Sequence, residues 1–314
     1  MTVAPSFAAA TAAASRLRQL SSSSHLPASE ILLPSNNGDR KQPPTTPLLA
    51  PKRIMVLRHG QAIHNPRAEL ARENGCSFEE FLQLMHEDDA FDADLTALGE
   101  EQAKQAGLIG HVQDALQKVD MIVSSPLSRA IRTADLFHNT TSNSSPKRVA
   151  IEHFREINGK LLNAKRRPRT ELETIFPHWN FSHVPSTDAT WTEELEPHHE
   201  CSERGYKGLL WIMQQNETNI LLVAHGGLLK MMMNDHPRVV LVDGRNKHPS
   251  NDMDRCVSQR FGNCELRSYI ISAWKNEAEI ADDATAINAE SSLHKTQPVI
   301  TLEEVTINSA VEQS

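Results

Sequence analysis

The sequence predicts an α/β fold with a largely parallel central sheet covered by helices on both faces. Three short apolar runs, residues 54–57, 121–123 and 220–223, have the length and composition of strands that are buried on both sides. Segments with helical periodicity separate these runs, and strands that alternate with helices form parallel sheets. The apolar periodic segments extend over residues 51–275, an amount of chain that one α/β core can fill.

The two ends of the chain lack this periodicity. Residues 1–50 are rich in Ala, Ser, Thr and Pro, which predicts a disordered segment. They contain Arg16 and Arg18 and no acid before Glu30, so an organellar transit peptide is an alternative to a simple extension. Residues 276–314 form a polar, acidic tail that we expect to be disordered, although 298–305 could form a weak strand without an evident partner.

The first and the last of the apolar runs each end at a histidine. Arg58-His59-Gly60 follows one run, and His225-Gly226 follows the other. Because the carboxyl ends of parallel strands meet at one edge of a sheet, we expect the two histidines to share a site. The glycines would let a ligand approach the backbone. A histidine beside an arginine suits an anion such as phosphate, with imidazole as nucleophile or proton carrier.

A helix start follows the second apolar run. Ser125 is expected to cap a helix whose first residue is Pro126. One face of this helix is apolar and consists of Leu127, Ala130, Ala134 and Phe137. Arg129 then lies in the first turn, close to the same edge of the sheet, where the helix start already attracts an anion.

Further helix starts lie between His59 and this helix. A helical stretch begins near Pro66, and Ser77 with Glu80 forms a capping box that opens the next helix. This insertion could cover the pocket. Thr96 is expected to cap another helix, with Glu100 in its first turn.

These motifs and their order resemble the histidine phosphatase superfamily over roughly Lys52 to Trp274. The similar segments are the signature Arg58-His59-Gly60, the stretch from Asp92 to Ala103, the stretch from Ser125 to Ala134, Phe154-Arg155-Glu156, and Ala224-His225-Gly226. The chain is most similar to the phosphoglycerate-mutase-like branch of uncertain substrate, on the basis of His64-Asn65, the basic run 165–169 and Phe176-Pro177. Gln61 departs from the glutamate of the metabolic mutases, which speaks against a sugar-pathway mutase.

The resemblance implies a three-layer α/β/α sandwich and a metal-independent phosphatase that hydrolyses a phosphate monoester through a phosphohistidine. The residues implied as catalytic are His59, Glu156 and His225, and those implied to bind substrate are Arg58, Gly60, Asn65, Arg129 and Gly226. Asp92 and Asp94 are the alternatives to Glu156 as proton donor. Two alternative hypotheses remain: a phosphomutase that uses the same intermediate, and a non-catalytic phosphate-binding interaction protein. No cofactor or metal is needed, and the expected partner is a small phosphorylated molecule.

Composition and charge bear on further questions of binding partner, cellular environment, metal binding and membrane insertion. A net charge of −8 argues against general nucleic-acid binding. The basic run 165–169 is interpreted as a solvated loop, or as part of the mouth of the site that selects a polyanion. Four scattered cysteines predict a reducing, cytoplasmic environment, with an organelle as the alternative. His198-His199-Glu200-Cys201 is read as a polar loop rather than a metal site, no apolar stretch is long enough to span a membrane, and the oligomeric state stays open.

Overall fold

The computed structural model describes residues 47–139, 145–242, 257–275 and 297–307. The expectations for residues 1–46, 276–296 and 308–314 lie outside the described residues. The described strands are β1 (Lys52–Arg58), β2 (Met121–Ser124), β3 (Lys147–Ile151), β4 (Asn180–His183), β5 (Asn219–Ala224), β6 (Val239–Val242), β7 (Leu266–Trp274) and β8 (Val299–Glu304). They form one sheet in the order β4-β3-β2-β5-β1-β7-β8-β6.

Most of the strand pairs in this sheet are parallel. β1, β2, β3, β4 and β5 pair only in parallel with one another, and β6 pairs in parallel with β8. β7 is antiparallel to both β1 and β8. The apolar runs that predicted a buried parallel sheet are therefore its central strands, and the predicted fold class is confirmed.

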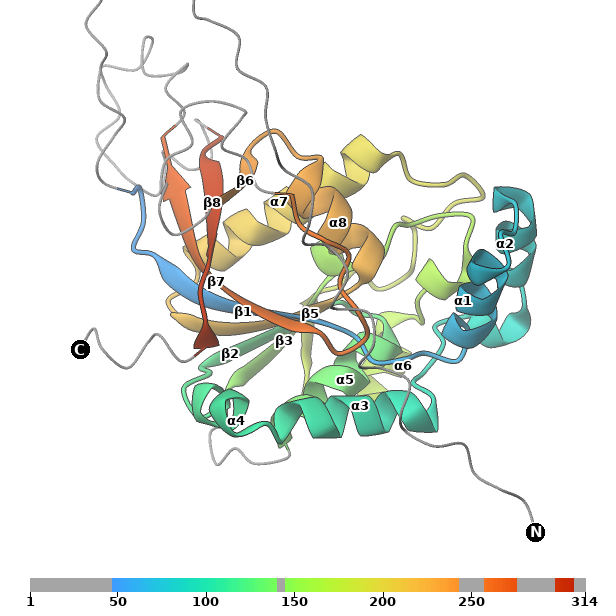
Figure 1. The fold of residues 1–314 in the computed structure, drawn as a ribbon, viewed down its shortest axis with the longest axis horizontal. Coiled ribbons are helices and arrows are strands. Elements are labelled where there is room, and N and C mark those ends of the chain that lie inside the picture. The colour runs from blue at the N-terminus through green and yellow to red at the C-terminus, as the bar shows by residue number, and fades with distance from the viewer. Residues whose placement is uncertain (1–46, 140–144, 243–256, 276–296, 308–314) are drawn as a thin grey trace, which may run out of the picture. The chain divides into compact units, whose positions relative to one another are not determined.

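Helices cover both faces of the sheet (Figure 1). The described helices are α1 (Asn65–Glu73), α2 (Phe78–Leu84), α3 (Ala97–Gly107), α4 (Gly110–Leu116), α5 (Ser128–Asn139), α6 (Arg169–Ile175), α7 (His198–Gln214) and α8 (Gly226–Asn234), with short 3₁₀ turns η1 (Asp88–Ala90), η2 (Glu152–Phe154) and η3 (Leu162–Ala164). Side chains of a strand alternate between its faces. Ile54 and Val56 accordingly pack in the core with α7 and α8, whereas Met55 and Leu57 pack in the core with α4, α5 and α6.

Most of the predicted helix starts are confirmed, and one is wrong. Ser77 forms a capping box with Glu80, and Thr96 accepts a hydrogen bond from Gly99 N at 3.0 Å. The helix after β2, however, begins at Ser128 and not at Pro126. The Ser125 hydroxyl accepts a bond of 3.3 Å from Leu127 N, which makes a turn before the helix. The predicted apolar face of this helix is fully buried, and Arg129 lies in its first turn as expected.

Part of the C-terminal segment belongs to the sheet. We expected residues 276–314 to be a disordered tail, but Val299–Glu304 form β8, which lies between β7 and β6. The expectation is wrong for these residues because Ile300 and Leu302 are fully buried in the core. The sequence marked the strand and did not mark its partners. At the other end, residues 47–50 are also described, and Leu48 N donates to Ala273 O of β7 at 2.7 Å.

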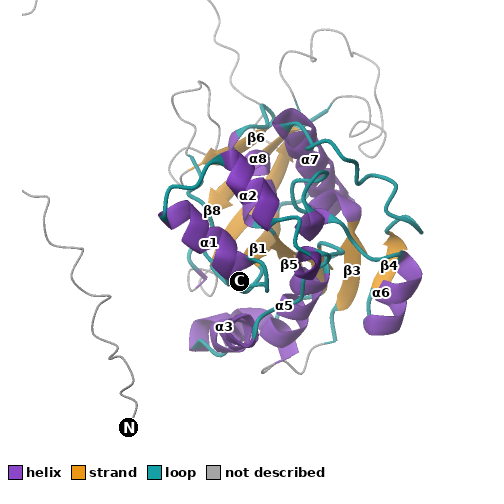
Figure 2. Ribbon diagram, turned by 90° about the vertical axis from the view of Figure 1, so that its right-hand side faces the viewer, coloured by secondary structure: helices purple, strands orange, loops and turns teal. Residues whose placement is uncertain are grey.

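A small helical layer covers the carboxyl edge of β1. Figure 2 looks onto this edge and shows α1 and α2 in front of the sheet, with α8 above and α3 and α5 below. The layer has its own small core, made by Ala68, Leu82, Met85 and Leu161. We call this layer the roof. It consists of α1 with its N-cap residue His64, of α2, and of residues 157–164, which include η3. No helix in the described part of the chain is long and apolar enough to cross a membrane.

Candidate active site

The two strand-end histidines lie together. β1 and β5 are neighbours in parallel register, with Arg58 opposite Ala224, so the residues that follow them meet at one edge. The ring centroids of His59 and His225 are 4.9 Å apart, and both side chains are buried. The convergence expected from the sequence is confirmed.

The hydrogen bonds of His59 fix which of its nitrogens can react. Nδ1 lies 2.6 Å from Gly60 O, and because a carbonyl only accepts, Nδ1 carries the proton. Burial, and next the positive charge of Arg129, hold the pKa of His59 well below its ordinary value. His59 is therefore neutral near pH 7, with a lone pair on Nε2.

Two arginines lie within electrostatic reach of His59. Arg129 is fully buried; its Nε lies 3.4 Å from His59 Nε2, and its NH1 donates to Asn163 O at 2.7 Å. Burial lowers the pKa of Arg129 to about 10, which leaves it charged at neutral pH. Arg58 is buried and is held by a bond from NH1 to Phe261 O at 2.8 Å. Arg58 is the last residue of β1, and Arg129 lies in the first turn of α5, the helix after β2.

Several polar atoms at this edge are buried without a hydrogen-bond partner among the described residues. They are Arg58 Nε, His64 Nδ1, Arg129 NH2, Asn163 Oδ1 and His225 Nδ1. Buried polar groups are nearly always paired, so a cluster of free ones indicates a place for a polar ligand. Most of these atoms are donors, which fits an anion.

His225 is oriented by the serine that precedes α5. Its Nε2 lies 2.7 Å from Ser125 Oγ, and both residues are fully buried. Leu127 N donates to this hydroxyl, and among the described residues His225 Nε2 is the acceptor within reach of the hydroxyl proton. Burial, and next the charge of Arg129, hold the pKa of His225 well below its ordinary value. A neutral His225 then carries its proton on Nδ1, the atom that has no partner.

Glu156 lies against the start of α8. Its Oε1 accepts from Leu228 N at 2.9 Å and from Ile157 N at 3.0 Å, and its Oε2 accepts from Gly227 N at 3.3 Å. The side chain is partly exposed. Burial mainly lowers the pKa of Arg129, but the charge of Glu156 raises it, so the carboxylate is within electrostatic reach of the arginine beside His59.

The two alternative acids are placed differently. Asp92 is almost fully buried; its carboxylate accepts from Ser128 N at 2.8 Å and Oγ at 2.5 Å, and pairs with Arg167 at 3.2 Å. Burial raises the pKa of Asp92 to about 6, against these hydrogen bonds. Asp94 is partly exposed and pairs with Arg132 at 3.2 Å.

The remaining expected residues have structural roles as well. Asn65 is buried, and its Oδ1 accepts from Ala62 N at 2.8 Å, which leaves its amide nitrogen for a ligand. A Cβ on Gly60 would lie 2.5 Å from Gly99 O, so the glycine is needed for the approach of α3. A Cβ on Gly226 would meet Arg58 Nε at 3.2 Å. Both glycines are thus also required by packing, in addition to the ligand approach expected from the sequence.

Sequence reasoning missed several residues that hold the site together. Thr133 Oγ1 accepts from Gly60 N at 3.0 Å and donates to Arg129 O at 2.7 Å. Asn263 Nδ2 donates to His59 O at 3.2 Å. Thr133 lies one helical turn after Arg129, a spacing that could have identified it. No local pattern marks Asn163 or Asn263, because each reaches the site from a distant loop.

The basic run 165–169 is not a solvated loop. Arg166 is buried and bonds Glu152 Oε2 at 3.0 Å and the carbonyls of Arg167, Pro185 and Thr187. Lys165 lies over the ring of Trp191 at 3.9 Å, and Arg169 pairs with Glu173. These cations hold loops in place through partners within the chain, and only Arg167, through Asp92, is linked to the start of α5.

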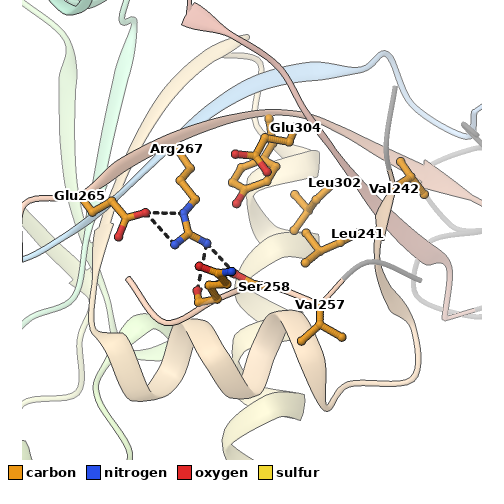
Figure 3. Close-up of a pocket in the computed structure, with 10 residues that line it drawn as sticks. Leu241, Val242, Val257, Ser258, Glu265, Arg267, Leu302 and Glu304 are labelled. Carbon is orange, nitrogen blue, oxygen red and sulfur yellow. Dashed lines mark hydrogen bonds and ion pairs between the residues drawn. The ribbon is translucent and has the colours of Figure 1, made fainter. Parts of the chain in front are cut away.

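Other features of the described residues lie away from these histidines. No group of three or more metal-ligating side chains occurs there, and His198 and Cys201 belong to the first turn of α7. A hollow of about 490 Å³ lies beside β6, β7 and β8. Figure 3 shows its lining residues, among which Arg267 bonds Glu265 and Ser258. None of the expected site residues lines it.

Comparisons with known proteins agree with this geometry. The Histidine phosphatase superfamily (branch 1) matches residues 54–253. A phosphoglycerate mutase-like protein of Arabidopsis thaliana is 30% identical over 257 residues, which cover 72% of this chain and 86% of the relative. Phosphoglycerate mutase-like protein 1 of the same plant is 29% identical over 252 residues, which cover 72% and 83%.

Two phosphatases are among the solved structures that match the chain. The mycobacterial glucosyl-3-phosphoglycerate phosphatase matches at a TM-score of 0.40 and 18% identity, over 70% of this chain and 93% of that one. The ecdysone phosphate phosphatase of Bombix mori matches at a TM-score of 0.41 and 16% identity, over 69% and 88%. On the sequence match that includes both strand-end histidines, the chain belongs to the histidine phosphatase superfamily, branch 1.

Proposed function

We propose that the protein is a phosphatase that hydrolyses a phosphate monoester through a phosphohistidine on His59. The observation that carries this proposal is the hydrogen bond from His59 Nδ1 to Gly60 O, which leaves a neutral Nε2 beside Arg129. A nucleophile needs a lone pair, and an anionic ester needs positive charge around it before it can be attacked. The lone pair on Nε2 accepts a long bond of 3.4 Å from Arg129 Nε, a donor that can turn to a phosphoryl oxygen when the ester binds.

In the first step, His59 Nε2 attacks phosphorus, the P–N bond forms and the ester P–O bond breaks. Arg58, Arg129 and the Nδ1–H of His225 bind the phosphoryl oxygens, whose charge they offset. The leaving alkoxide needs a proton. Glu156 supplies it from Oε2, because that oxygen accepts only one long bond whereas Oε1 accepts two shorter ones.

In the second step, water attacks the phosphoryl group and the P–N bond breaks. The carboxylate of Glu156 takes a proton from this water, phosphate leaves, and Nε2 regains its lone pair. The bond from Nδ1 to Gly60 O persists through both steps, so His59 does not need to turn. The chain's own cations supply the charge for both steps, and we expect activity to survive exhaustive chelation of divalent ions.

The experiment that tests the proposal traps the intermediate. Brief incubation with a ³²P-labelled monoester and acid-free quenching should leave label on His59, stable to alkali and labile to acid, as a phosphoramidate is. His59→Ala should abolish the label. His86→Ala removes an exposed histidine after α2 and should retain it. Label on serine or cysteine, or label that survives in His59→Ala, contradicts the proposal.

Product analysis separates hydrolysis from phosphoryl transfer within a substrate. A phosphatase releases inorganic phosphate, whereas a mutase returns the group to a second hydroxyl of the same carbon skeleton. We expect phosphate release to account for the consumed ester. Isomerised ester without phosphate release would support the mutase.

A further inference from the structure

We infer that His64 and Asn163 form a polar subsite in the roof that binds a hydroxyl group of the leaving alcohol, so that the preferred substrates are phosphates of polyols or sugars. This inference rests on the proposed phosphatase function, whose site it extends. The subsite lies outside the set of residues that hold the phosphoryl group.

Both residues are buried and both have an unused polar atom. His64 is 3% exposed and Asn163 is 8% exposed. Asn163 Nδ2 lies 3.2 Å from His64 Nε2, so the two side chains already touch. His64 Nδ1 and Asn163 Oδ1 have no hydrogen-bond partner among the described residues. A structural pair buried this deeply would be expected to satisfy both of these atoms.

The pair offers one donor and one acceptor. Because Asn163 Nδ2 donates to Nε2, a neutral His64 carries its proton on Nδ1, which is then a free donor, while Asn163 Oδ1 is a free acceptor. Exchanging the amide O and N together with the histidine tautomer reverses these roles and still leaves one donor and one acceptor. A hydroxyl group donates and accepts, so it can satisfy either atom, whereas a phosphoryl oxygen only accepts and can serve only the donor.

The charge state of His64 supports this match. Burial, and next the charges of Arg129 and Arg67, hold the pKa of His64 well below its ordinary value. The pair is therefore neutral near pH 7. A neutral pair suits a neutral hydroxyl better than an acidic group.

The position of the pair places it on the side of the leaving group. The phosphoryl-binding groups follow the sheet strands or start α5 and α8, whereas His64 precedes α1 and Asn163 belongs to η3, both in the roof. Arg129 joins the two parts, since its Nε lies 3.4 Å from His59 Nε2 and its NH1 donates to Asn163 O. The roof therefore lies beside a phosphoryl group held at the sheet edge, and the inference assigns the leaving alcohol to this side.

The test compares two esters that differ only in hydroxyl groups, glycerol 1-phosphate and n-propyl phosphate. For the native chain we expect kcat/KM to be higher for glycerol phosphate by about 10- to 100-fold, the range for a buried polar pair left unmatched. Asn163→Ala keeps the backbone carbonyl that holds Arg129 and should remove this preference. His64→Ala should do the same, and both variants should hydrolyse propyl phosphate at a rate within about threefold of the native rate. His86→Ala is the control, and it should retain the preference.

Each outcome decides between the two proposals. Equal losses on both esters, together with weaker vanadate binding, would show that the pair contacts the phosphoryl group and would overturn the inference. The inference is also overturned if the native chain hydrolyses both esters equally well with a labelled His59, while the phosphatase proposal stands. If neither ester nor nitrophenyl phosphate is hydrolysed, the phosphatase proposal itself fails. Thermal unfolding of each variant reports any loss of folded protein.

Discussion

The starts of α5 and α8 face the same pair of histidines, and each holds a carboxylate against its backbone N–H groups. Asp92 accepts from Ser128 N of α5, and Glu156 accepts from Gly227 N and Leu228 N of α8. Both arrangements satisfy donors that a helix start leaves free. The two carboxylates differ in access, because Asp92 is 1% exposed whereas Glu156 is partly exposed.

This difference in exposure distinguishes a carboxylate with a structural role from one that can reach a substrate. Burial raises the pKa of Asp92 to about 6, a value that would suit an acid catalyst. Both of its oxygens are nevertheless occupied, by Ser128 and by Arg167. A carboxylate whose pKa is raised by burial, but whose oxygens are both bonded within the protein, is therefore expected to have a structural role. We infer that Glu156 donates the proton and that Asp92 fixes the start of α5.

The largest effect is expected at Glu156. Glu156→Gln keeps the shape and removes the proton that an alkoxide needs on leaving, whereas a nitrophenolate leaves without one. The burst rate on an alkyl phosphate should fall by about 10²–10⁴, and the burst rate on nitrophenyl phosphate should fall much less. Rapid-quench measurement of the burst avoids the second step, in which the same carboxylate activates water.

Asp92→Asn in parallel is the control for this comparison. Equal losses on both esters in Glu156→Gln would mean that Glu156 positions the phosphoryl group. A selective loss on the alkyl ester in Asp92→Asn would transfer the role of the acid to Asp92.

The second prediction concerns stability at the start of α5. Because the pKa of Asp92 is raised from 3.8 to about 6, its contribution to stability is full below the unfolded pKa and is lost as pH rises through 6. Between about pH 4 and pH 7, the native chain should lose about 2 kcal/mol relative to Asp92→Asn. Urea unfolding of both proteins across this range measures the difference. If the native chain instead gains stability relative to Asp92→Asn as pH rises, the bonds from Arg167 and Ser128 to the carboxylate outweigh the cost of burying its charge.

The third prediction concerns the serine that links the two helix starts. Ser125 precedes α5 and bonds His225, the residue that caps α8. Ser125→Ala leaves Nε2 buried without a donor, so the proton of His225 can move from Nδ1 to Nε2. We expect kcat/KM to fall about 10-fold, and ¹⁵N NMR of the imidazole should show the change of tautomer. An unchanged tautomer would mean that the backbone alone orients His225.

The sequence predicted the site residues at the edge of the sheet better than those in the roof. His59, Arg129 and His225 were identified because each directly follows a strand or opens a helix, so local order along the chain fixes its position. The register that brings Asn163 beside His64 depends on how residues 157–164 pack against α1 and α2, and no local pattern encodes it. The start of α5 was misplaced because Ser125 is a favourable cap residue whose hydroxyl serves His225 instead. β8 was missed as part of the sheet because a single strand does not reveal its neighbours.

The smallest effect is expected at Asp94, the other carboxylate near α5. Its side chain is 42% exposed, pairs with the partly exposed Arg132 at 3.2 Å, and accepts from Leu95 N at 2.8 Å. An ion pair that solvent reaches in this way contributes about 0–1 kcal/mol, because solvent screens it. Asp94→Asn should therefore change the burst rate on either ester by less than about twofold. Combined with Glu156→Gln, it should add nothing further to the loss on the alkyl ester. A further selective loss on that ester would show that Asp94 supplies a proton when Glu156 cannot. The assignment of proton transfer to the carboxylate at α8, and of structural roles to the two carboxylates near α5, would then be wrong.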